Sequence, residues 1–374
     1  MRFGLDARTI TEHYPGIGRY VYHLAGALAD AAPDDTLVLL LNRNQDNRRY
    51  DLAALWERPN VEIGWANARP VSHREQVGLP WLAQRLRLDV LHSPYYVKPY
   101  ALPVPSVTTV YDVTPALYPE YLPSGRARVA YELTTRLAVE TSAALVTLSQ
   151  TARQDMIERF DARPDHIHVT VPAVDGRFHP RPEAEIAEMR RRLGLPDSYI
   201  LYLGINKPHK NLLRLVEAFA SVAPAVPNIA LVMAGRRDPR YPEAMQQVMA
   251  LRLANRVVAL DDVPEADLPA LYSGAALFVF PSLYEGFGFP VLEAMACGVP
   301  VITSNTSSLP EVAGQAALLV PPDDTRLLAQ SMSVVLQDGR LWNRLRAASL
   351  SRAREFSWAK TAQETLAVYR QVAR

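Results

Sequence analysis

The sequence predicts an α/β protein built from two doubly wound domains, each with a parallel sheet covered by helices on both faces. At 374 residues the chain has the length of two ordinary domains. Short apolar runs alternate with longer amphipathic ones, as in strand–helix repeats. The apolar runs lack a period of two, which is typical of strands buried on both sides. This rhythm stops once, at 176–197, and then restarts.

The first half of the chain alternates strands with helices of mixed polarity. Strands are predicted at 1–7, 36–42, 88–94, 105–113, 143–149 and 166–174. Helices are predicted at 16–30, 126–142 and 151–160, where apolar residues recur at helical spacing.

Residues 176–197 are polar, proline-containing and partly helical, so we interpret them as the connection between the domains. Beyond them, strands are predicted at 199–204, 229–235, 256–260, 276–282, 300–305 and 317–322. Helices are predicted at 211–223, after 235, and at 266–275, 290–298, 324–339, 340–356 and 357–374. The last of these has no strand to follow it.

Composition excludes several classes of protein. A formal net charge of +1 lacks the basic excess of a nucleic-acid binder. A single cysteine, Cys297, allows no internal disulfide and no cysteine-based zinc site, which suits a reducing cytoplasm. The histidines show no metal-ligand spacing and there is no Asp-x-Asp motif, so we expect no metal and no cofactor. No leader peptide and no membrane-spanning run is evident, which leaves only a peripheral membrane contact.

The segment LYEGFGFPVLEAMACGVPV, residues 283–301, places two carboxylates around a glycine turn. Glu285 lies in the turn after a predicted strand, and Glu293 lies one turn into a helix that begins near Pro290. Glycines let the backbone approach a ligand, and N–H groups at a helix start attract phosphate. Carboxylates accept hydrogen bonds from hydroxyls, so the pattern suits a sugar nucleotide. Ligands of such sheets lie beyond the carboxyl ends of the strands, which predicts a site in the cleft between the two domains.

In this setting the sequence resembles the retaining glycosyltransferases of family 4, which have the GT-B fold of two Rossmann-like domains. The Glu-x7-Glu signature carries the resemblance together with four further segments in the family's order. They are GIGRYVYHLAGAL, LGINKPHKN, VVALDDVPEADLPALYSGA and VITSNTSSLPEVAGQAALLVPPDD. The resemblance implies a first domain over 1–180, completed by the helix 357–374, and a donor-binding domain over 190–356.

The resemblance also implies roles for particular residues. Glu285 would contact the donor sugar, Glu293 the ribose, and Lys210 the leaving diphosphate. Ile205 stands where many members have arginine, so Lys207 is a candidate for the second positive charge. The remaining donor-side positions are Gly16, Gly18, Gly286, Phe287, Gly288 and Val263. The alternatives are a solvated helix carboxylate for Glu293, a partner of the helix N-terminal dipole for Glu285 and a surface lysine for Lys207.

The first domain departs from the family at one position. Many members carry histidine where this chain has Tyr111, followed by Asp112. Tyrosine is a poor base near neutral pH, since its ordinary pKa is about 10. Transfer in this family is described as a front-face reaction in which the leaving phosphate takes the acceptor proton. We therefore expect Tyr111 and Asp112 to contact the donor sugar or the acceptor, with Arg19 and His92 on the acceptor side. Strand-end packing for Tyr111 and a hydrogen-bonded turn histidine for His92 are the alternatives.

The resemblance implies a metal-independent enzyme that forms an α-glycosidic bond. Its donor would be a nucleotide-diphosphate sugar. The GLDAR, GIGRY and SLYEGFGFPVLEAMACGVPV patterns favour GDP-mannose, and UDP-sugars are the alternative. Its acceptor would be a glycan or lipid-linked hydroxyl in polysaccharide synthesis at the inner membrane face. Two alternatives remain: an enzyme acting on a sugar nucleotide or sugar phosphate alone, and a sugar-nucleotide-binding partner subunit with reduced catalysis.

Overall fold

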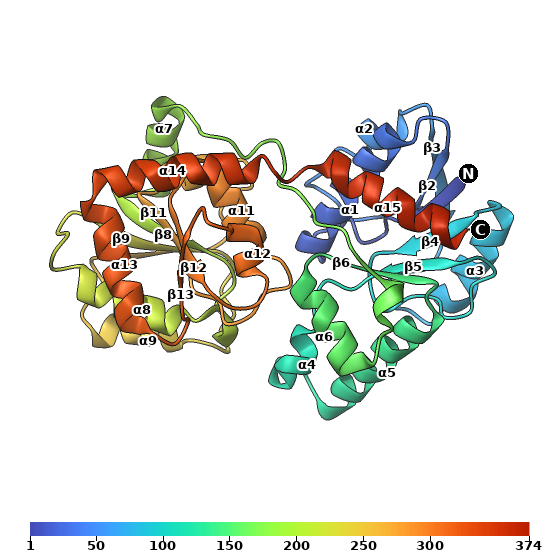
Figure 1. The fold of residues 1–374 in the computed structure, drawn as a ribbon, viewed down its shortest axis with the longest axis horizontal. Coiled ribbons are helices and arrows are strands. Elements are labelled where there is room, and N and C mark those ends of the chain that lie inside the picture. Colours follow the sequence, from blue (N-terminus) through green and yellow to red (C-terminus); the bar gives the residue numbers. More distant parts are fainter. Residues whose placement is uncertain (374) are drawn as a thin grey trace. The chain divides into compact units, whose positions relative to one another are not determined.

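The computed structural model describes residues 1–373, apart from the side chain of Pro15. The last residue of the predicted final helix, Arg374, lies outside the described residues. Within them the chain forms two compact units, and each contains one parallel sheet with helices on both faces (Figure 1). Unit 1 comprises residues 1–173 and 357–373, and unit 2 comprises residues 174–356. The predicted α/β class with two doubly wound parallel sheets is confirmed.

Unit 1 has a sheet of seven strands in the order β3-β2-β1-β4-β5-β6-β7, and all neighbours are parallel. The strands are β1 (Arg2–Asp6), β2 (Thr36–Asn42), β3 (Val61–Ala66), β4 (Val90–Ser93), β5 (Ser106–Thr109), β6 (Ala144–Thr147) and β7 (Ile167–Val169). The helices are α1 (Pro15–Ala31), α2 (Ala53–Trp56), α3 (Glu75–Arg85), α4 (Thr114–Leu117), α5 (Gly125–Thr141), α6 (Gln150–Phe160) and α15 (Trp358–Val372). Short 3-10 turns occupy Pro119–Tyr121 and Pro164–His166.

Unit 2 has a parallel sheet of six strands in the order β10-β9-β8-β11-β12-β13. The strands are β8 (Tyr199–Leu203), β9 (Ala230–Ala234), β10 (Val257–Leu260), β11 (Leu277–Phe280), β12 (Val301–Ser304) and β13 (Leu318–Val320). The helices are α7 (Glu183–Leu193), α8 (Leu212–Val222), α9 (Glu243–Ala250), α10 (Leu268–Ser273), α11 (Phe289–Ala296), α12 (Leu309–Ala313), α13 (Thr325–Gln337) and α14 (Gly339–Ala353). A 3-10 turn occupies Pro208–Lys210.

Residue chemistry explains where these elements begin. The central strands are almost wholly buried, as in β2 and β11, which fits their unbroken apolar runs. Several helices begin at a side-chain cap: Ser124, Ser149, Asp324 and Asp338 each accept a hydrogen bond from a backbone N–H group in the first turn. Such caps fix the helix starts, and thereby the loops that leave the strands.

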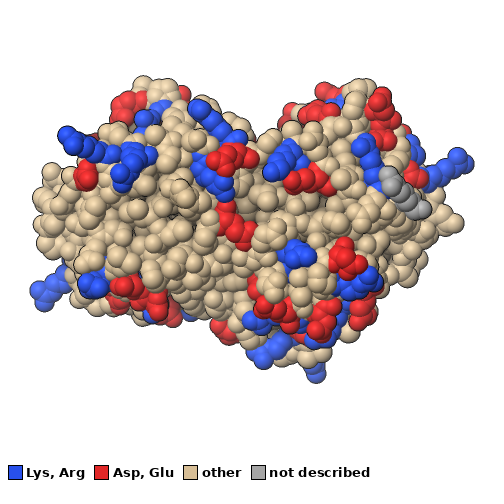
Figure 2. All heavy atoms as spheres, viewed as in Figure 1, with Lys and Arg blue, Asp and Glu red and all other residues tan. Residues whose placement is uncertain are grey.

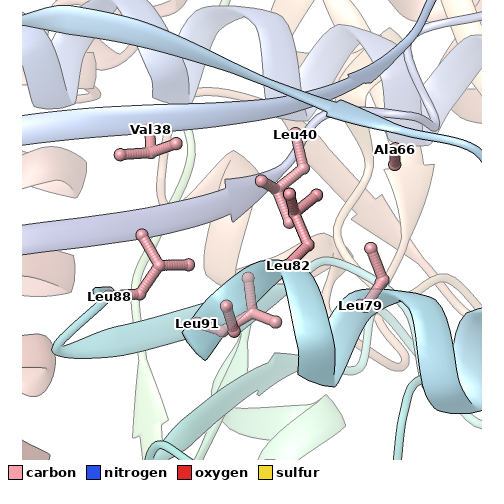
Figure 3. Close-up of a cluster of buried hydrophobic side chains, with 8 residues drawn as sticks. Val38, Leu40, Ala66, Leu79, Leu82, Leu88 and Leu91 are labelled. Carbon is pink, nitrogen blue, oxygen red and sulfur yellow. The ribbon is translucent and has the colours of Figure 1, made fainter. Parts of the chain in front are cut away.

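The core of unit 1 includes a cluster of aliphatic side chains beneath α3 (Figure 3). Leu79 and Leu82 of α3 point toward Val38 and Leu40 of β2, and all four are at most 6% exposed. This packing orients α3 and therefore decides which of its side chains face solvent. Neither α3 nor β3 was predicted from the sequence. Strand β3 lies at the sheet edge and alternates buried and exposed residues, so it lacks the continuous apolar run of the central strands.

The C-terminal helix α15 packs beside α1 within unit 1 (Figure 1). The ring of Tyr369 lies 5.4 Å from that of Phe3 in β1, and Tyr369 is fully buried. The final helix therefore contributes to the core around the first strand.

On the face drawn in Figure 2, basic and acidic side chains are interspersed on both units. Among the described residues, no helix is long and apolar enough to cross a membrane. Within the same residues, no group of three histidine, cysteine or acidic side chains is placed to hold a metal ion.

Candidate functional site

The candidate site of unit 2 lies where the strand order reverses. Strands β8 and β11 are neighbours in the sheet, while the chain leaves β8 toward β9 and leaves β11 toward β12. Loops that diverge from adjacent parallel strands leave a crevice at their carboxyl ends, where such sheets bind ligands. The loop after β8 carries Lys207 and Lys210, and the loop after β11 carries Glu285.

Lys210 and Glu285 form an ion pair at this point. The Lys210 Nζ lies 2.6 Å from the Glu285 Oε1, and the two side chains are 14% and 13% exposed. Ser282 Oγ donates a second hydrogen bond to the same carboxylate oxygen at 2.6 Å. The ammonium group also lies 5.5 Å from the centre of the Phe280 ring. The structure thus joins the predicted sugar-binding carboxylate to the predicted phosphate-binding cation.

The negative charge of Glu285 acts on the neighbouring phenol of Tyr202. Burial, followed by the nearby charge of Glu285, raises the pKa of Tyr202 well above its ordinary value. Tyr202 donates its hydroxyl proton to the Ile205 carbonyl, which helps to fix the glycine loop after β8.

The backbone of Glu285 is held by two serines that were not predicted from the sequence. Ser307 Oγ accepts from the Glu285 N–H group at 3.0 Å and donates to the Glu285 carbonyl at 2.6 Å. Ser308 Oγ donates to the Glu285 and Phe287 carbonyls at 2.8 and 2.7 Å. Both serines belong to the VITSNTSSLPEV segment, whose resemblance to the family gave no role to single residues.

Asn211 is a second positioning residue that the sequence did not reveal. It adopts φ +62°, a left-handed conformation that asparagine tolerates better than most residues. Its amide donates to the carbonyls of Pro281 and Pro322 at 3.1 and 2.6 Å. This side chain ties the loop after β8 to the loop after β11, and so fixes Lys210 relative to Glu285.

His209 precedes Lys210 but carries no positive charge near neutral pH. It is 5% exposed, and burial, together with Lys210 and Lys207, lowers its pKa to about 3. Lys207, by contrast, is half-buried, and its charge acts on Asp238 and His209. Of the basic residues in this loop, Lys207 and Lys210 therefore remain the candidates for binding phosphate.

Glu293 lies deeper than the sequence indicated. It belongs to α11, is 2% exposed and accepts a hydrogen bond from the Tyr272 hydroxyl at 2.8 Å. A carboxylate held in this way is not a solvated helix residue, which removes the simplest alternative to a binding role.

The glycine turn at the start of α11 is conformationally special. Gly288 has φ +118°, and a Cβ there would lie 3.0 Å from Leu309 Cδ2. Phe287 is buried in the same turn, whereas Val263 is half-buried in the loop after β10. A small cavity is lined by Gly204, Gly235 and Ala259 at the ends of β8, β9 and β10, and Val263 is not among its lining residues.

The other predicted site residues belong to unit 1. Gly18 is buried in α1, and a Cβ there would lie 3.0 Å from the Thr9 carbonyl oxygen, which explains the need for glycine. Gly16 is exposed with open space around it. Arg19 is half-buried on the same helix, and Asp112 accepts a hydrogen bond from the Thr114 N–H group at 2.7 Å.

Tyr111 has a buried hydroxyl group with no hydrogen-bond partner within residues 1–373. Burial, with minor contributions from Tyr20 and Tyr95, raises its pKa well above the ordinary value. Its ring packs edge-on against Tyr20 at 5.4 Å. Tyr111 therefore remains protonated near neutral pH.

His92 corresponds to the alternative interpretation rather than to an acceptor contact. It is 0% exposed, and its ring nitrogens make hydrogen bonds to the Tyr369 and Thr109 hydroxyls at 2.6 and 2.7 Å. Burial lowers its pKa to about 3. Since both ring nitrogens already have hydrogen-bond partners, the acceptor contacts proposed below do not include His92.

A buried ion network that was not predicted from the sequence stands at the end of β1. Arg8 donates to both carboxylate oxygens of Asp6 and to Glu75 Oε2 at 2.9 Å, and none of the three is more than 6% exposed. Arg8 also donates to the Ala68 carbonyl at 2.8 Å. The network fixes the loop that leads from β1 to Gly16 and Gly18.

Comparison with known proteins agrees with this architecture. Residues 14–177 match the family described as Glycosyltransferase Family 4, and residues 185–352 match the one described as Glycosyl transferases group 1. The chain is 31% identical to the Escherichia coli protein named O-antigen chain mannosyltransferase B, over 96% of this chain and 97% of that protein. It is 33% identical to the Escherichia coli serotype-specific mannosyltransferase WbdA over 70% of this chain, a match that spans only 33% of the relative.

Solved structures show the same fold at lower identity. Sucrose-phosphate synthase from Thermosynechococcus elongatus superposes with a TM-score of 0.76 at 21% identity, over 99% of this chain and 98% of that one. Anabaena Alr3699/HepE, solved in complex with UDP and glucose, gives 0.73 at 19% identity over 99% of both chains. These folds and sequence matches define a glycosyltransferase with the GT-B fold. The chain belongs to the family 4 glycosyltransferases, with the group 1 domain in its second half.

Proposed function

We propose that the protein is a retaining glycosyltransferase that moves mannose from a nucleotide-diphosphate donor to a hydroxyl of a glycan or lipid-linked acceptor. The single observation that carries the proposal is the ion pair between Lys210 and Glu285 at the switch point of unit 2. Mannose as the sugar, and polysaccharide synthesis as the setting, follow from the names of the O-antigen chain relatives.

The ion pair suits a donor that carries phosphate beside hydroxyls. A diphosphate would compete with Glu285 for the Lys210 ammonium, and sugar hydroxyls would donate to the released carboxylate. The two charges neutralise each other until the ligand replaces the contact. Lys207 and the start of α11 add to the positive potential at the diphosphate.

In the proposed reaction, the bond from the anomeric carbon to the leaving phosphate oxygen breaks as the acceptor oxygen attacks from the same face. The acceptor hydroxyl loses its proton to the departing phosphate oxygen, so the products are an α-glycoside and a nucleoside diphosphate. Lys210 stabilises the charge that grows on the phosphate. Glu285 orients the sugar, and Tyr111 and Asp112 contact the donor sugar or the acceptor. No metal is required, because lysines and helix N–H groups bear the phosphate charge.

Tyr111 supports a phosphate-assisted proton transfer over one that uses a protein base. Its hydroxyl is buried and its pKa is raised, so it does not accept a proton near neutral pH. The same observation keeps a second candidate function in view: a partner subunit that binds a sugar nucleotide but has reduced catalysis. Slow hydrolysis of the donor to free sugar and nucleoside diphosphate distinguishes the enzyme from such a subunit.

A thermal-shift panel of UDP, GDP, ADP and their sugar conjugates tests donor binding. A ligand that binds only the folded state stabilises it by about 2.7 kcal/mol at one hundred times its dissociation constant. We expect GDP and GDP-mannose to raise Tm, and we expect Glu293→Gln to abolish the shift. That variant keeps an oxygen to accept from Tyr272, so loss of the shift reports on the ribose rather than on folding. If no nucleotide raises Tm, the proposal is wrong.

A further inference from the structure

Unit 1 contains a pocket that the proposed chemistry does not use. It lies between the carboxyl end of the edge strand β3 and the helix α3, and its volume is about 340 Å³. Its lining includes Trp65, Asn67, Arg74, Gly78, Leu79 and Trp81. This volume falls within the range of small-ligand sites.

Two tryptophans at this pocket are unusually exposed for residues of their size. Trp65 is 41% exposed and Trp81 is 58% exposed. Leu79 and Leu82, which lie beside Trp81 along α3, are buried in the core cluster and form part of the apolar wall of the pocket (Figure 3). Exposed aromatic side chains grouped at one hollow mark a binding surface more often than scattered ones do.

Each tryptophan ring is accompanied by an arginine. The guanidinium of Arg43 lies 5.2 Å from the centre of the Trp65 ring, and that of Arg85 lies 5.1 Å from the centre of the Trp81 ring. Such cation–π contacts favour one orientation of an exposed ring. The indoles are therefore held in place before any ligand arrives.

Two polar side chains that line the pocket have donors and acceptors that the protein itself does not use. The side chains of Asn67 and Arg74 are exposed and make no hydrogen bond or ion pair within the described part of the chain. An amide both donates and accepts, and a guanidinium presents five N–H donors. The pocket thus combines aromatic faces with groups that bind hydroxyls.

This combination matches a pyranose ring, which has an apolar C–H face and a rim of hydroxyl groups. Indole rings pack against the apolar face, while the amide and guanidinium bind the rim. A lipid bilayer would also accept tryptophan and arginine, but it needs an apolar surface that projects into the interface. Here the indoles flank a hollow that is partly polar, which favours a sugar.

Gly78 keeps the hollow open. It lies in the middle of α3, where glycine is less favourable than alanine. A Cβ at this position would lie 4.0 Å from the Ala68 Cβ, an ordinary contact, so space rather than strain surrounds the glycine. A larger side chain at position 78 would fill the pocket without altering either tryptophan.

The position of the pocket along the sheet also suits an extended acceptor. Strand β3 is separated from β5 by β2, β1 and β4, which amounts to four strand spacings, or about 19 Å. The loop after β5 carries Tyr111 and Asp112, which are proposed to contact the donor sugar or the acceptor. A glycan chain whose end reaches that loop has a residue further along the chain at the distance of β3.

We propose that the pocket between Trp65 and Trp81 binds an interior residue of a neutral glycan acceptor, away from its reacting end. The identity of the glycan rests on the proposed function. If the pocket binds an interior residue, the enzyme should prefer long acceptors to short ones.

Indole N–H resonances provide a test that requires no turnover. The protein has five tryptophans, and single Trp→Phe variants assign their signals. We expect α-linked mannotetraose to shift the Trp65 and Trp81 signals saturably. Trp56, 40% exposed but outside the pocket, should not respond. Gly78→Leu should abolish the response and Gly78→Ala should retain the fold. The proposal is overturned if mannotetraose moves neither signal, or if only vesicles of anionic phospholipid do.

A kinetic comparison separates this site from the donor site. We expect Trp81→Ala to raise KM for a mannotetraose acceptor about tenfold and to leave KM for GDP-mannose unchanged, whereas Trp56→Ala changes neither. Equal effects on tetrasaccharide and monosaccharide acceptors would contradict a remote subsite. The resonance shifts do not depend on catalysis. If mannotetraose shifts the signals but no transfer occurs, the proposed function is wrong and this inference stands. If transfer occurs but the signals do not shift, only this inference is wrong.

Discussion

The Lys210 ammonium lies 2.6 Å from the Glu285 carboxylate, and together they join the loops that leave two adjacent strands of unit 2. The pair is mostly enclosed, since the side chains are 14% and 13% exposed. Removing either partner leaves a poorly solvated charge without its counterion. Binding and stability are therefore linked at this point, because a donor would have to separate the two groups.

A double-mutant cycle on this pair should reveal strong coupling. We expect Lys210→Met and Glu285→Gln together to destabilise the fold by about 1–3 kcal/mol less than the sum of the single changes. Urea unfolding measures the free energies. The matched control in the same unit is Arg237 with Asp261, whose side chains are 51% and 42% exposed, and whose coupling should stay below about 1 kcal/mol. Equal coupling in both pairs would contradict an enclosed ion pair.

The glycines at the start of α1 should respond differently to alanine. A Cβ at Gly18 would lie 3.0 Å from the Thr9 carbonyl oxygen and 3.2 Å from the Ile10 Cα, so Gly18→Ala should cost about 1–3 kcal/mol. A Cβ at Gly16 would have no atom within 4 Å, and Gly16→Ala should be neutral or stabilise by up to about 1 kcal/mol. Chemical denaturation of both variants checks this. If Gly18→Ala were as stable as Gly16→Ala, the loop after β1 would be able to move away from the added Cβ at no cost, and the prediction would be wrong.

Stability should decrease as the pH falls, because of His92. Its pKa is lowered to about 3 in the folded state, against about 6.5 when unfolded. The unfolded chain therefore binds the proton first, so the stabilisation is complete above pH 6.5 and is lost as the pH falls toward 3.

The slope from one such histidine reaches about 1.4 kcal/mol per pH unit. We expect His92→Gln to lower stability at pH 7 and to reduce the slope between pH 6 and pH 4.5, as measured by urea unfolding. The pKa of His209 is also lowered to about 3. His209 should therefore contribute an equivalent slope in unit 2, and it serves as the control. An unchanged slope in His92→Gln would mean that the ring is not neutral in the folded protein.

Tyr111→Phe should distinguish a hydrogen-bonding role from a basic one. The hydroxyl group has no partner within residues 1–373, so its removal should leave stability unchanged or slightly raised. If the hydroxyl only donates to a ligand oxygen, kcat/KM for mannose transfer should fall about tenfold. Loss of a general base would cost about 10²–10⁴-fold. A loss of that larger size would contradict proton transfer to the leaving phosphate.

The sequence predicted the two sheets because their central strands are continuous apolar runs buried on both faces. It missed β3 because an edge strand alternates, as VEIGWA does, and it missed α3, which contains both Gly78 and Pro80. The exposed side of that helix, with Trp81, was therefore not recognised as a surface.

Single side chains were harder to predict than elements. Lys210 and Glu285 could be selected because they stand at the motif positions of the family that the sequence resembles, and the sheet order makes the strands before them neighbours. Ser307, Ser308 and Asn211 could not, because their partners are backbone carbonyls of residues distant in sequence. His92 follows the same strand-end rule as Lys210, yet the ring turns into the core, which the strand rule does not determine.

The most direct test of the proposed reaction is a transfer assay with GDP-α-mannose and a mannose-terminated acceptor, followed by NMR of the anomeric proton. We expect an α-linked product with stoichiometric GDP, and a loss of at least about 10²-fold in Glu285→Gln. A β-linked product would contradict the retaining reaction. If no nucleotide sugar of a UDP, GDP and ADP panel were turned over or hydrolysed, and Glu285→Gln changed nothing, the proposed function would be wrong.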